Sequence, residues 1–85
     1  MESLIDFRAF EERFQSALFF SLFEGLLPDG RFRFVVGEEP IELYQRVSDS
    51  LLKNCVWTYR KAGPDWWEVE IHKKTLQVNQ IKIGS

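Results

Sequence analysis

Four short segments alternate between hydrophobic and polar residues, which is the pattern of half-buried strands. The clearest places Phe32, Phe34 and Val36 on one face and arginines on the other. The last two segments are separated by a turn that contains Gly63 and Pro64, which predicts a hairpin. The four predicted strands span residues 4–8, 31–36, 55–60 and 67–72.

Two stretches between these strands have helical spacing. The first runs over residues 10–27 and is followed by Pro28 and Gly30, residues that stop helices and turn chains. The second runs over residues 40–52 and begins with a proline, which is tolerated at the first helical position. Its apolar residues recur every four positions, at Leu43, Val47 and Leu51.

The order strand, helix, strand, helix, strand, strand contains no linker, repeat or low-complexity stretch. It predicts a single domain over residues 1–85 of the α+β class. The expected architecture is a two-layer β-α-β-α-β-β sandwich with two helices on one face of a four-stranded mixed sheet. The core is expected over about residues 4–73. The tail, residues 74–85, keeps some alternation and either adds an edge strand or frays.

The first helix carries more large apolar residues than one sheet face can cover. At 100° per residue, the predicted core face consists of Phe10, Phe14, Ala17, Leu18 and Leu22. The predicted outer face consists of Phe19, Phe20, Phe23 and Leu26. This outer face is a candidate interface for a second copy of the chain or for a partner helix. The alternative is that the helix lies deeper in the core than this assignment places it.

Trp66 is a second candidate for an interface. Because it alternates with Trp67, it is expected to point away from the core, and an exposed tryptophan is a favoured anchor for protein partners. The alternative is that the C-terminal tail packs over it.

Composition limits the classes of function. Eight Phe, three Trp and two Tyr in 85 residues provide enough apolar area for a core without a metal or disulfide. The net charge of −2 disfavours general nucleic-acid binding. A local patch of Arg31, Arg33 and Arg60 remains as an alternative. No apolar run approaches the ~20 residues of a membrane span, and the single cysteine favours a reducing, cytoplasmic environment.

Few residues offer reactive chemistry. Cys55 is in phase with Trp57 and Tyr59, which favours a buried, inert thiol over a redox site. His72 is the only histidine and is expected on the solvent-facing side of its strand, so no Cys/His zinc site is predicted. Carboxylates near the start of the second helix stabilise its dipole, and we predict neither a metal nor a cofactor there. They are Glu38, Glu39 and Glu42.

The end of the sequence carries a spaced motif, in which Trp57 is followed by Gly63-Pro64 and then by Trp67-Glu68-Val69-Glu70-Ile71. This resembles the W-x5-G-P-x-x-W-x-V-x-I signature of the TusA/SirA-like domain of unknown function 2249. Upstream, the resemblance continues at Ile5-Asp6-Phe7-Arg8, Leu27-Pro28-Asp29-Gly30, Glu39-Pro40 and Leu43-Tyr44. It covers about residues 4–73. It implies the same β-α-β-α-β-β fold and a place beside sulfur carriers and domains associated with hemerythrin-like modules.

The chain departs from these relatives at two points. Sulfur carriers of this fold hold a reactive Cys before a Pro at the start of the first helix, and residues 8–12 contain neither. The His of the family's H-D-P segment is replaced by Glu38. Persulfide carriage by the standard mechanism is therefore not expected, and any role of that imidazole is lost or altered.

These observations favour a small, non-catalytic interaction or regulatory domain that contacts another protein or itself. The alternative is a carrier associated with sulfur relay or redox chemistry, with Cys55 as the thiol and Arg8 near the ligand. Accessibility of Cys55 to a thiol reagent distinguishes the two.

Overall fold

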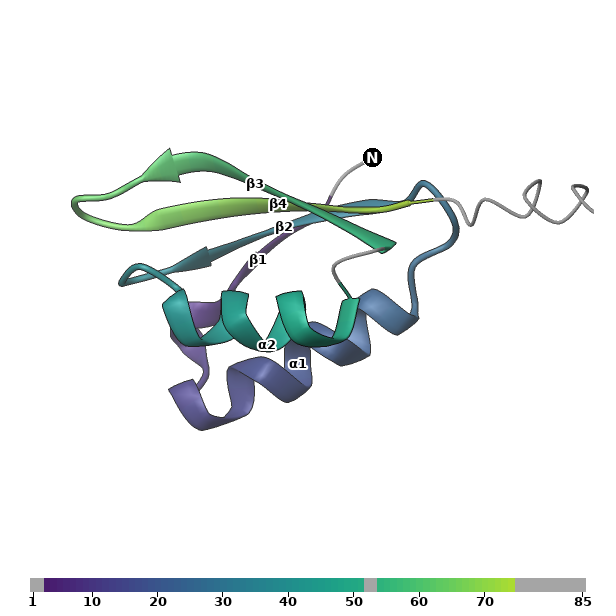
Figure 1. Ribbon diagram of the computed structural model, residues 1–85. Helices are drawn as coiled ribbons and strands as arrows, with labels where there is room; N and C mark the ends of the chain where they lie inside the picture. The colour runs from purple at the N-terminus through teal and green to yellow at the C-terminus, as the bar shows by residue number, and fades with distance from the viewer. Residues whose placement is uncertain (1–2, 52–53, 75–85) are drawn as a thin grey trace, which may run out of the picture.

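A computed structural model describes residues 3–51 and 54–74 of the chain. Two helices cover one face of a four-stranded mixed sheet, which confirms the predicted α+β class (Figure 1). The predicted edge strand in the tail falls outside the described residues, apart from Lys74. The elements are β1 (Ser3–Asp6), η1 (Phe7–Ala9), α1 (Glu12–Glu24), β2 (Arg31–Val36), α2 (Ile41–Leu51), β3 (Cys55–Ala62) and β4 (Trp67–Lys73).

The strand order is β1-β2-β4-β3, with β1 parallel to β2 and the other two pairs antiparallel. The register aligns Phe34 with Ile5 on one side and with Val69 on the other. In the hairpin, Val69 is opposite Tyr59. A register shift after Tyr59, before Lys61, marks a bulge in β3, which is an edge strand.

Aromatic rings fill the space between the helices and the sheet. Phe19 of α1 is completely buried, and its ring centroid lies 5.6 Å from that of Phe32 and 5.9 Å from that of Phe34. On the other side of Phe34, the ring of Phe7 stacks at 4.5 Å. Trp57 of β3 lies 6.2 Å from Phe19. Such pairs add about 0.5–1.5 kcal/mol each beyond their area burial, so this cluster fixes α1 against the sheet.

The predicted orientation of α1 is wrong. Phe19 and Phe23 are buried in the core, and Phe20 and Leu26 pack partly buried against it. These four residues therefore do not form an exposed interface. Of the residues predicted to be core, Phe10 and Phe14 are 46% and 52% exposed, Ala17 is exposed, and only Leu18 and Leu22 pack against the core.

The reason for this error lies in the composition of α1. Apolar residues lie nearly all around the helix, so their periodicity does not define one face. Phe19 packs on the phenylalanines of β2 and Phe23 stacks on Phe19, so burying this face removes large aromatic rings from water. In addition, Phe10 precedes the helix, which begins at Glu12.

The C-terminal end of α1 is joined to β4 by Lys73. The Lys73 ammonium donates hydrogen bonds to the carbonyl oxygens of Phe23 and Leu26, at 3.2 and 2.9 Å. It also lies 5.0 Å from the centre of the Phe23 ring. A cation at this end of a helix satisfies unpaired carbonyls and complements the helix dipole. No helix of the described chain is long and apolar enough to cross a membrane.

The burial of the two faces of α1 leads to a paired prediction. Phe19→Ala should lower the free energy of unfolding by about 3–5 kcal/mol, because it leaves a cavity among aromatic rings. Phe14→Ala should cost less than about 1 kcal/mol, since half of that side chain is already in water. Denaturant unfolding of both variants measures the difference. Equal losses, or a larger loss for Phe14→Ala, would contradict the observed orientation of α1.

Candidate functional site

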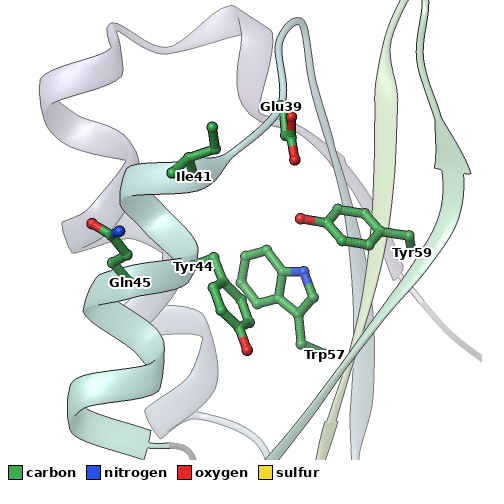
Figure 2. Close-up of a pocket in the computed structure, with 6 residues that line it drawn as sticks. All are labelled: Glu39, Ile41, Tyr44, Gln45, Trp57 and Tyr59. Atoms are coloured by element: carbon green, nitrogen blue, oxygen red, sulfur yellow. The ribbon is translucent and has the colours of Figure 1, made fainter.

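An open cleft of about 470 Å³ lies between α2 and β3 on the helix-covered side of the sheet (Figure 2). Its lining is mostly aromatic and apolar, with one carboxylate. The lining residues are Glu39, Ile41, Tyr44, Gln45, Trp57 and Tyr59. We refer to this site as the aromatic cleft.

The local sequence explains why these side chains meet. In α2, Leu43 and Val47 are buried toward the sheet, so Tyr44, the residue after Leu43, lies beside them and reaches β3. In β3, alternation places Trp57 and Tyr59 on the face that α2 covers. The two elements therefore contribute aromatic rings to one cleft.

The rings form a continuous edge-to-face series. Tyr44 lies 5.1 Å from Trp57, Trp57 lies 6.1 Å from Tyr59, and Tyr59 lies 5.6 Å from Trp67. Trp57 also meets Phe34 of the core edge-to-face at 5.7 Å. Tyr44 and Tyr59 remain 40% and 41% exposed. The floor of the aromatic cleft is thus held by the core while its two walls face solvent.

The indole N–H of Trp57 is buried and has no hydrogen-bond partner among the residues that the structure describes. Leaving a buried donor unsatisfied costs about 1–3 kcal/mol. Figure 2 shows the indole nitrogen on the side of the ring that faces Tyr59, whose hydroxyl points into the aromatic cleft, and the Glu39 carboxylate at one end. An oxygen atom of a bound molecule would supply the missing acceptor once a side chain that covers the N–H, such as Tyr59, turns aside.

A second, more polar groove adjoins the aromatic cleft at the end of the fold where both helices begin. Arg8 and Glu38 line it, and Glu39 and Ile41 line both hollows. Arg8 is held by Asp6, which accepts two side-chain hydrogen bonds at 2.9 Å. These bonds lower the pKa of the Asp6 carboxyl and raise that of the Arg8 guanidinium. Arg8 is therefore already paired.

Cys55 lies far from Arg8 in the sheet. Cys55 pairs with Lys73 in register, whereas Arg8 contacts Gly37, just beyond the opposite end of β2. Cys55 is buried, and this burial raises the pKa of its thiol to about 11. The structure therefore does not assemble the pairing of Cys55 with Arg8 that the sulfur-relay alternative needs.

The remaining candidate residues are dispersed. His72 Nε2 lies 3.1 Å from a carboxylate oxygen of Asp29. Trp66 is 37% exposed and carries the Lys61 ammonium 4.5 Å above its ring. Within residues 3–51 and 54–74, no group of three metal-ligating side chains is placed to hold an ion.

Carboxylates accompany the arginines on the open face of the sheet. Arg31 and Arg60 both contact Glu70, at 2.9 and 3.2 Å, and Arg33 contacts Glu68 at 2.9 Å. Glu70 is buried between its partners. This face therefore presents paired charges instead of the uncompensated positive row that phosphates attract.

The hairpin turn explains the Gly-Pro and Trp of the C-terminal motif. Gly63 has a φ of +60°, a conformation that side chains disfavour, and its N–H donates to the carbonyl of Trp66 at 2.9 Å. The Trp67 ring lies 3.4 Å from where a Cβ of Gly63 would be. The motif is thus a structural unit that supports the Trp67 end of the ring series.

A family described as "Uncharacterized conserved protein (DUF2249)" matches residues 4–73. The chain belongs to this family. The match covers α1, β2, α2, β3 and β4 completely. No curated protein and no solved structure matches the chain. The family part of the resemblance is therefore confirmed, and the further relationship to TusA- and SirA-like proteins stays a prediction.

In this DUF2249 chain, the motif residues outside the hairpin turn include two groups that line adjoining hollows. Glu39, Tyr44 and Trp57 line the aromatic cleft. The neighbouring groove is lined by others, among them Arg8, Glu38, Pro40 and Leu43. The three cleft residues were predicted as motif positions, and Glu39 also as a carboxylate at the start of the second helix, whereas Ile41, Gln45 and Tyr59 were not predicted as site residues. The alternation of Trp57 with Tyr59 was the available signal, but it does not show which helix lies opposite.

The environment of Cys55 predicts slow modification. At pH 8, a pKa of about 11 leaves roughly a hundredfold less thiolate than the ordinary value of 9.0. A thiol reagent should therefore react with the native protein at least about a hundredfold more slowly than with the protein unfolded in guanidinium, and the native rate should keep rising through pH 10. Similar rates in the two states would contradict the burial of this thiol.

Proposed function

We propose that this DUF2249 protein is a non-catalytic interaction domain that binds a segment of another protein in the aromatic cleft. The observation that carries the proposal is the buried indole N–H of Trp57, which lies at the floor of an open cleft and has no partner within residues 3–51 and 54–74. The aromatic cleft thus replaces the outer face of α1 as the contact surface.

The chemistry of the aromatic cleft supports recognition. Exposed tyrosines beside a partly buried tryptophan are the residue types that dominate binding energy at protein interfaces. Ile41, which is 54% exposed, extends the apolar surface toward solvent. The one thiol of the chain, Cys55, lies outside the aromatic cleft and is buried.

The proposal has two broader parts. The element order β-α-β-α-β-β supports a TusA-like relationship. The free thiol of Cys55, the only cysteine, supports a reducing, cytoplasmic location.

Selection from a random peptide library tests the proposal without a known ligand. Peptides selected on the wild-type protein should bind the Tyr44→Ala/Tyr59→Ala variant at least about tenfold more weakly, because the variant removes both exposed walls. They should also shift the side-chain N–H resonance of Trp57 in NMR spectra. Both substitutions are at half-exposed positions, so the variant should remain folded.

Phe10→Ala/Phe14→Ala provides the matched control, since it also removes two half-exposed rings, but outside the aromatic cleft. It should bind the selected peptides like the wild type. Peptides that bind the tyrosine variant as well as the wild type, or that respond to the phenylalanine pair instead, would overturn the proposal.

A further inference from the structure

The aromatic cleft has features that identify the kind of segment it binds. We propose that its occupant is an extended, proline-containing segment of a partner protein, with a basic residue directed at Glu39. This inference rests on the proposed function and adds the chemistry of the partner. Three observations support it: an unsatisfied donor, the tilt of the rings, and a carboxylate that has no ion pair among the described residues.

The donor is the indole N–H of Trp57, which needs an acceptor oxygen. A simple organic cation would pack on the rings but would leave this donor unpaired. The backbone of a polyproline II segment has no internal hydrogen bonds, so its carbonyl oxygens are available to a donor. A carbonyl oxygen that accepts a hydrogen bond from the Trp57 N–H would remove the free-energy cost of leaving this donor unsatisfied. This gain is made only in the bound state.

The tilt of the rings suits compact, rigid apolar groups. The ring of Trp57 meets Tyr44 at 77° and Tyr59 at 78°, so the ring faces form angled notches along the aromatic cleft instead of one flat stack. Aromatic-lined grooves with this character bind proline-rich segments, which lose little conformational entropy because they are already extended. A volume of about 470 Å³ accommodates a short segment, being toward the lower end of the usual pocket range.

The carboxylate of Glu39 gives the aromatic cleft a direction. Figure 2 shows it at the end nearest Ile41 and Tyr59. Of the three arginines that line the adjoining groove, Arg8 pairs with Asp6 and Arg13 with Glu11, and Arg46 forms no ion pair with Glu39 among the described residues. A lysine or arginine that flanks the prolines of the partner would lie opposite Glu39. The net charge of the chain, −2, also favours a positively charged partner.

Three synthetic peptides of about ten residues test the inference. The first contains prolines and a terminal arginine, the second replaces the prolines with glycine and serine, and the third replaces the arginine with glutamate. The first peptide should shift the Trp57 indole resonance and bind at least about tenfold more tightly than the second. The third should bind about twofold to fivefold more weakly than the first, the range of an exposed ion pair.

Three variants assign the interactions to residues. Glu39→Gln should abolish the difference between the arginine and glutamate peptides while the preference for proline remains. Trp57→Phe keeps a ring but removes the N–H, and should weaken binding of the first peptide about tenfold. Because Trp57 also packs on the core, a second test uses Tyr44→Ala, which changes a half-exposed side chain. This variant should weaken binding of the first peptide by a similar factor.

The outcomes separate this inference from the proposed function. If library peptides bind in the aromatic cleft but the proline peptide binds no better than the glycine-serine peptide, the proline inference is wrong and the interaction domain stands. If neither the library nor the proline peptide perturbs Trp57, both fail. If the Trp57 resonance shifts with protein concentration alone, the occupant is a second copy of the chain, which also overturns the inference.

Discussion

The contact of Phe19 with the sheet is the interaction on which the rest of the structure depends. Its ring touches both core phenylalanines of β2 and reaches Trp57 of β3. One side chain of α1 therefore contacts two strands that are separated in the sheet by β4. Because large rings make up much of the core of this small domain, the cluster holds the helix layer against the sheet, with α2 beside β3.

Trp57 connects this core to the surface. One side of its indole packs against Phe19 and Phe34, and the other meets the exposed rings of Tyr44 and Tyr59. A side chain held from both directions is preorganised, so a ligand does not have to order it. The domain leaves the N–H unsatisfied at this position, which is the kind of local conflict expected at functional sites.

Strands with strict alternation were predictable because period two leaves only one assignment of faces. The sequence of β2, with Phe32 and Phe34 inward, and the hairpin around Gly63-Pro64 are examples. The phase of α1 was not predictable, because apolar residues surround it and only the rings of β2 decide which face is buried. The aromatic cleft needs Tyr44 and Trp57 to meet from separate elements, and the order of the strands, not their sequence, brings them together.

The central claim is that the Trp57 N–H is reserved for an acceptor supplied by a partner. The most direct test is a crystal structure of the protein bound to a peptide selected on it. We expect a peptide carbonyl oxygen about 2.7–3.2 Å from Trp57 Nε1, between the rings of Tyr44 and Tyr59. A peptide bound elsewhere, with the aromatic cleft empty and Nε1 paired to a group of the protein itself, would contradict the account.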